Sequence, residues 1–188
     1  MRSVLTRSHL ASEPPLEMSR PLAVDARVAL AVDADIRAIA GIVAETWRAT
    51  YAPLVGAAAV GRMVHALLSH DALLSLAHQR DIDMPVAFVG DSMAGTALAR
   101  HGHDGLHILR LYVLPRFQGQ GVGQALLDWL ALRQPPESGI RLEVAAGNER
   151  ALRFYLRAGF LDRGGGSETI AGARFEVRRL ERPGFSTA

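Results

Sequence analysis

The 188-residue sequence contains no cysteine and no lysine. Without cysteine the chain can form no disulfide, no thiolate metal site and no cysteine nucleophile. All 21 basic residues are arginines, and 19 acidic residues leave a net charge of only +2. The isoelectric point near 9.6 therefore reflects a lack of groups that titrate above neutral pH. With no cluster of basic charge, the composition argues against a nucleic-acid-binding protein.

Long apolar runs are also missing. Residues 1–22 contain Arg2, Arg7 and Glu13 and lack the apolar region of a secretory signal. No stretch approaches the roughly 20 apolar residues that span a bilayer. The length suits one domain. We expect a flexible extension over residues 1–22, one domain over residues 23–183, and a cytoplasmic protein without membrane contacts.

Hydrophobic periodicity predicts elements in the order β-α-α-β-β-β-α-β-α-β-β. The expected strands cover residues 26–32, 86–89, 93–99, 106–114, 140–145, 160–163 and 174–180. The first expected helix starts after Asp33 and ends at Pro53. The second covers residues 57–68 and could continue to residue 77. Two further helices cover residues 124–132 and 148–158. Residues 164–166, all glycine, are expected to be flexible. This order predicts a mixed sheet with helices packed against it.

Residues 118–123 form a glycine-rich loop between the strand at 106–114 and the next helix. Such a loop offers unpaired backbone N–H groups and the positive end of a helix dipole, which suit a diphosphate. The dinucleotide pattern G-x-G-x-x-G fails because Gln124 stands at the third glycine position, and the Walker pattern fails without lysine. A purely structural turn and another kind of nucleotide-binding loop remain alternatives.

Two blocks resemble the GCN5-related N-acetyltransferase (GNAT) family. The loop is similar to the family's Gln/Arg-x-x-Gly-x-Gly/Ala motif at Gln118, Gly121 and Gly123. Residues 148–160 are similar to the segment N-x-x-A-x-x-F-Y-x-x-x-G-F at every key position, and residues 47–51 also look like the family. The resemblance covers residues 26–181.

The resemblance implies a GNAT fold: an α/β domain with one mixed, mostly antiparallel sheet of about seven strands. The sheet would splay between strands 4 and 5, with helices on both faces. Acetyl-CoA, as cosubstrate, would lie in the wedge, and no metal is implied. The residues expected to contact it are Leu111, Tyr112, Val113, Gln118, Gly119, Gln120, Gly121, Val122, Gly123, Gln124 and Asn148.

Three residues are candidates for proton transfer. Tyr155 matches the family tyrosine beside the CoA sulfur and is the expected acid; core aromatic packing is the alternative. Glu143 lies in a Leu-Glu-Val strand similar to that of the ribosomal-protein alanine N-acetyltransferases, twelve residues before Tyr155. It is one candidate base, unless it only pairs with an arginine such as Arg141. His107, four residues before Leu-Tyr-Val, is the competing base, unless it is an ordinary strand histidine.

Other polar residues carry weaker signals. His101, His103 and His107 have neither the placement nor the carboxylate or thiolate pattern of a metal site. Arg150, Arg153 and Arg157 are expected to form a solvated helix face, with Arg116 as a weak phosphate contact.

The predicted function is transfer of acetyl from acetyl-CoA to a primary amine by direct attack. The acceptor is a protein N-terminus or a small-molecule amine, and a homodimer is left open. Acceptor specificity is expected from residues 51–76 and from a loop at 164–173. The alternative is a non-catalytic, acyl-CoA-binding regulatory domain.

Overall fold

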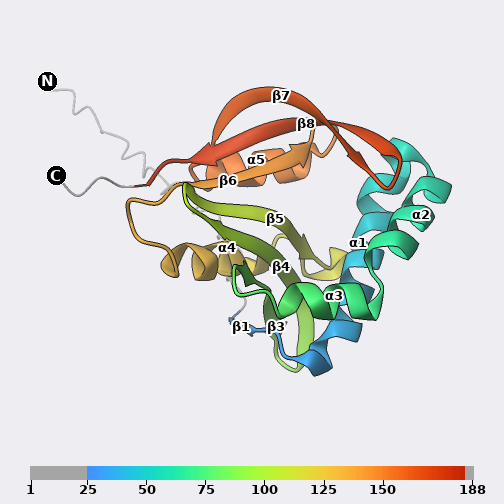
Figure 1. The fold of residues 1–188 in the computed structure, drawn as a ribbon, viewed down its shortest axis with the longest axis horizontal. Helices are drawn as coiled ribbons and strands as arrows, with labels where there is room; N and C mark the ends of the chain where they lie inside the picture. Colours follow the sequence, from blue (N-terminus) through green and yellow to red (C-terminus); the bar gives the residue numbers. More distant parts are fainter. Residues whose placement is uncertain (1–24, 185–188) are drawn as a thin grey trace, which may run out of the picture.

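The structure, a computed structural model, describes residues 25–184 (Figure 1). The extension expected at residues 1–22 lies outside these residues. Within the described range, no helix is both long enough and apolar enough to cross a bilayer.

One mixed sheet of eight strands runs through the molecule in the order β1-β3-β4-β5-β6-β8-β7, with β2 paired to β4. The strands are β1 (Ala26–Leu30), β2 (Ile82–Asp83), β3 (Pro85–Val89), β4 (Ser92–Gly102), β5 (Gly105–Val113), β6 (Ile140–Ala145), β7 (Leu161–Ile170) and β8 (Ala173–Arg182). Every pair is antiparallel except β5 and β6. The mixed, mostly antiparallel sheet is confirmed. Its eighth strand is β2, which is too short to show a hydrophobic period.

Helices cover both faces of the sheet, as expected (Figure 1). One face carries α1 (Ile36–Val55), α2 (Ala57–Leu67) and α3 (His70–Ala77), with Trp47 and Met63 in their core. The other carries α4 (Val122–Leu132) and α5 (Glu149–Arg157), packed on residues such as Leu126 and Leu142. Short 3-10 turns, η1 (Asp33–Asp35) and η2 (Pro115–Phe117), precede α1 and the glycine-rich loop. Two separate apolar cores therefore lie on opposite faces of one sheet.

The helix boundaries differ from the expected ones in three places. Asp33 does not cap α1, because η1 intervenes and the Asp33 carboxylate binds Nε2 of His78 at 2.8 Å. Helix α1 continues past Pro53 and ends at Val55, because the next residue, Gly56, has a φ of 85°. The option of one helix reaching residue 77 is wrong, because the Ser69 hydroxyl accepts the Ala72 N–H and starts α3.

The glycines at residues 164–166 belong to β7 and are not a flexible loop. Gly165 and Gly166 pair with Arg178 and Val177 of β8. A Cβ on Gly166 would come within 2.7 Å of the Arg179 guanidinium, so the missing side chain leaves room for that arginine. Backbone pairing with β8 therefore orders a segment whose three glycines, taken alone, suggest conformational flexibility.

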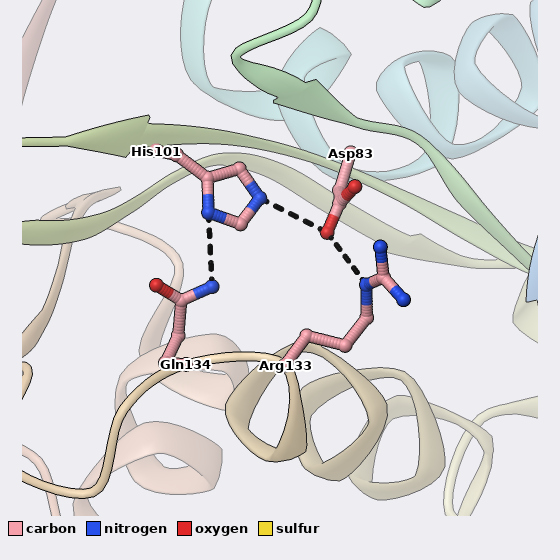
Figure 2. A network of polar contacts seen from close by, with 4 residues as sticks. All are labelled: Asp83, His101, Arg133 and Gln134. Carbon is pink, nitrogen blue, oxygen red and sulfur yellow. Dashed lines mark hydrogen bonds and ion pairs between the residues drawn. The ribbon is translucent and has the colours of Figure 1, made fainter.

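A polar network ties the sheet to the end of α4. Figure 2 shows the Asp83 carboxylate between His101 and Arg133, each 3.0 Å away, while Gln134 lies 3.0 Å from the other imidazole nitrogen. Asp83 is only 7% exposed. A buried carboxylate needs such partners to offset the loss of water.

Replacing Asp83 with alanine is expected to lower the free energy of unfolding by about 1–3 kcal/mol, because His101 and Arg133 lose a shared acceptor. Urea denaturation measures the change. Asp81→Ala is the matched control, since Asp81 pairs with Arg100 at the surface, where ion pairs contribute about 0–1 kcal/mol. Equal losses for the two variants would refute a stabilising role for the network.

Candidate active site

Strands β5 and β6 diverge after three paired residues. Leu106, His107 and Ile108 pair with residues 140–142, and no pairing follows. Just beyond this point Leu109 forms a bulge with no partner on β4, because Leu98 pairs with Arg110 and Ala99 with Ile108. The expected splay between the fourth and fifth predicted strands is therefore present. It is closed at His107 and opens toward Val113 and Ala145.

The glycine-rich loop lies beyond the open end of the splay. Gly119 and Gly121 have φ of 84° and 91°, and Gly121 is the left-handed residue directly before α4. The backbone N–H groups of residues 119–124 find no acceptor within residues 25–184. Together with the N-terminus of α4 they form an environment suited to an anion. This is the observation that fits the diphosphate of CoA.

The glutamine side chains of this segment bond within the protein. Gln118 Nε2 donates to the Val113 carbonyl, Gln120 Nε2 to the Arg116 carbonyl, and Gln124 Nε2 to the Asp128 carboxylate, each at 2.8 Å. Gln118 thus links the loop to the end of β5. Backbone N–H groups, more than these amide side chains, are available to a ligand.

A cavity of about 380 Å³ lies between the loop, α1 and the start of α5. Its lining residues are Ala49, Thr50, Pro115, Gln118, Gly147, Asn148, Glu149 and Arg150. Of the expected cofactor residues, Gln118 and Asn148 line it. The Asn148 side chain also caps α5 by accepting the Ala151 N–H at 3.1 Å. The two motifs that carry the family resemblance therefore meet at one cavity.

Arg150 is exposed, as expected for a solvated helix face, and it also lines the cavity. Its guanidinium lies 3.9 Å from the position that a Cβ on Gly119 would take. Arg153 instead binds Glu149 at 2.9 Å, and Arg116 lies 3.6 Å from Glu45. Arg150 stands in the first turn of α5, where a cation opposes the helix dipole.

Tyr155 is buried in the core under β5 and β6. Its ring lies between Phe154 and Phe160, at centroid distances of 4.9 and 5.4 Å. Burial raises the pKa of Tyr155 well above its usual range, and nearby Tyr112 raises it further. Tyr112 packs on Trp47 on the opposite face of the sheet. Tyr155 and Tyr112 therefore belong to the two apolar cores on opposite faces of the sheet.

The two candidate bases form one pair. His107 Nε2 lies 2.9 Å from Glu143 Oε2, at the closed end of the splay. Their neighbours Ile108 and Leu142 point into the core under α4 and α5, so the pair lies on the α1 face. Arg141 binds Asp104, so the alternative pairing of Glu143 with Arg141 is wrong. The structure joins two residues that the sequence treated as competitors.

His101 and His103 lie elsewhere. His101 belongs to the Asp83 network, and His103 is exposed. Across residues 25–184, no three histidine or acidic side chains are arranged to hold a metal ion.

Comparison with known proteins agrees with this arrangement. The profile of the acetyltransferase (GNAT) family matches residues 54–160. The PaiA N-acetyltransferase of Thermoplasma acidophilum, solved in complex with coenzyme A, is 21% identical with a TM-score of 0.71, over 85% of this chain and 99% of that one. Ard1 of Thermoplasma volcanium is also 21% identical, with a TM-score of 0.64, over 87% of this chain and all of that one. These two likenesses concern the fold.

A curated relative is the mycothiol acetyltransferase of Propionibacterium freudenreichii subsp. shermanii, 42% identical over 77 residues. The match covers 36% of this chain and 25% of the relative, so the chain spans about a quarter of that protein. The family profile, in contrast, covers more than half of the chain. This match, which agrees with the splayed sheet and the glycine-rich loop, shows that the chain belongs to the acetyltransferase (GNAT) family.

Proposed function

We propose that this acetyltransferase moves the acetyl group of acetyl-CoA to a primary amine by direct attack. The observation that carries the proposal is the splay itself, with the His107–Glu143 pair at its closed end and unpartnered backbone amides at its open end. The acceptor is a protein N-terminus or a small-molecule amine.

The phosphates of the cosubstrate fit the open end. Backbone N–H groups of residues 119–124 and the Arg150 guanidinium would hold the diphosphate. Beyond Ile108, backbone groups of β5 that face away from β4 have no strand partner. Those of residues 111–113 would bind the pantetheine arm. One of these N–H groups would stabilise the negative charge that develops on the thioester oxygen.

His107 would take the proton that leaves the attacking ammonium. The Glu143 carboxylate would orient the imidazole and stabilise its protonated form. Direct attack needs no cysteine on the enzyme, consistent with the composition. An α-amine, with a pKa of about 8, gives up its proton more readily than a lysine amine at about 10.4.

Tyr155 would protonate the departing thiolate. Burial raises the pKa of Tyr155, so its hydroxyl keeps its proton at every working pH. In the balanced reaction a C–N bond forms and the thioester C–S bond breaks. The ammonium loses two protons: one reaches solvent through the base, and the other restores Tyr155 after its own proton has passed to the CoA thiolate.

The decisive experiment measures thiol release from acetyl-CoA with a panel of amines. We expect amine-dependent thiol release and one acetylated product per thiol. Tight acetyl-CoA binding without turnover on any amine would contradict the proposal and favour the regulatory alternative.

Replacing Gly121 with valine is expected to weaken CoA binding roughly tenfold or more. Valine is strained at a φ of 91° and would shift the amides that face the diphosphate. Isothermal titration with CoA measures the loss. Gly164→Val is the matched control: Gly164 also has positive φ and open space, but lies in β7 at the far edge of the sheet. Normal CoA binding by Gly121→Val would refute the assignment of the loop.

A further inference from the structure

Arg110 is a half-buried cation for which no ion-pair partner is found within residues 25–184. It follows the bulge at Leu109 in β5, and its guanidinium lies 5.8 Å from the ring centre of Trp47 on α1. Arg178, which is also half-buried, holds the Asp162 carboxylate at 2.6 Å. An arginine fork matches a carboxylate through two parallel hydrogen bonds. The Arg110 guanidinium forms no such pair with a carboxylate of the described residues.

The polar groups around Arg110 are hydrogen-bond donors. Trp47 is 2% exposed, and its indole N–H has no acceptor in the described part of the chain. Tyr112 packs edge-on against Trp47, with ring centres 6.2 Å apart. Burial raises the pKa of Tyr112 and of Tyr51, so both hydroxyls stay protonated. The Arg110 guanidinium and the neighbouring indole N–H are together complementary to an anionic, accepting group.

One carboxylate lies near this cluster. Glu168, exposed on β7, is close enough to raise the pKa of Tyr51 and Tyr112. It forms no ion pair with Arg110. The Arg110 guanidinium therefore has no carboxylate bound to it among residues 25–184.

Arg110 and the proposed base lie on the same face of β5. His107 precedes Arg110 by three residues, which is about 10 Å of extended strand, shortened by the bulge. An amino acid placed between them would make one hydrogen bond of about 3 Å to each group. The site thus has a basic end for the amine and a cationic end for an anion.

We propose that Arg110 binds a carboxylate of the acceptor, which makes the substrates amino acids and their small derivatives that retain a free carboxylate. This inference rests on the proposed acetyl transfer. A stacked arginine that only packs on Trp47 is the competing explanation.

The test uses matched acceptors with acetyl-CoA: each L-amino acid, its carboxamide and its decarboxylated amine. We expect wild type to prefer a carboxylate over its carboxamide by about tenfold or more in kcat/KM. Arg110→Gln is expected to raise KM for that acid by about tenfold and to change kcat/KM for the amide by less than about twofold. Arg27→Gln is the matched control, because Arg27 also stacks on an aromatic ring, Phe88, at the far edge of the sheet.

Several outcomes would overturn the inference. Equal use of acid and amide by wild type would do so without any variant, even if Arg110→Gln failed to fold. Equal losses with acid and amide in Arg110→Gln would indicate a structural role only. Acetylation confined to amines without a carboxylate would refute the role of Arg110 but leave acetyl transfer intact. Failure of every amine to release thiol would refute both proposals.

Discussion

Replacing Tyr155 with phenylalanine is expected to lower kcat roughly tenfold or more while acetyl-CoA binding stays unchanged. The variant removes only the hydroxyl that would protonate the thiolate. Phenylalanine keeps the contacts with Phe154 and Phe160, so the fold should be retained. Steady-state thiol release at saturating acetyl-CoA and amine measures kcat, and calorimetric titration with CoA measures binding.

The pH dependence gives a second measurement for Tyr155. Burial raises the pKa of Tyr155, and a raised pKa means that the acid form persists to higher pH. An exposed tyrosine loses its proton at about pH 10. We therefore expect no decline of wild-type kcat from this group below about pH 10. Unchanged kcat in the phenylalanine variant would remove Tyr155 from the mechanism and leave it as a core residue.

Loss of the His107 side chain is expected to lower kcat/KM for the amine by roughly 10²-fold, the usual contribution of a general base. Glu143→Gln is expected to lower kcat/KM for the amine about tenfold, because the ionic hydrogen bond to the imidazole becomes neutral. If the two side chains act as one unit, the double variant loses about as much as His107→Ala alone. Initial rates of the three variants at saturating acetyl-CoA test this.

The matched control for the pair is His78→Ala. His78 also binds a carboxylate, that of Asp33, at 2.8 Å, but the two lie at α3 and η1, outside the splay. The kcat/KM of His78→Ala for the amine should match that of the wild type. Losses that multiply in the double variant would mean that His107 and Glu143 act separately. A full loss with Glu143→Gln and none with His107→Ala would make Glu143 the base.

The local parts of the fold could be predicted because short-range chemistry determines them. Asn148 caps α5 through a residue three positions later, and Gly159 ends it with a φ of 85°. Gly121 adopts the left-handed conformation that starts α4. Each feature depends on a few neighbouring residues, so the two family motifs correctly predicted the loop and the helix.

Predictions failed where pairing between distant segments decided the structure. The glycines of β7 are ordered by β8, and the two-residue β2 exists only because β4 lies beside it. Composition and periodicity carry no information about such contacts.

By itself, the sequence determined the family, the glycine-rich loop and the candidates for the reactive side chains, because these follow from residue types at fixed spacing. It also excluded cysteine chemistry and, without lysine, every side-chain amine of the protein itself. Only the tertiary structure decided how those side chains combine. His107 and Glu143 stand 36 residues apart and meet because β5 and β6 pair in parallel before they diverge. The bulge at Leu109 then directs Arg110 to the same face as His107. Strand register depends on long-range packing, and it decides which of these polar residues come together in one site.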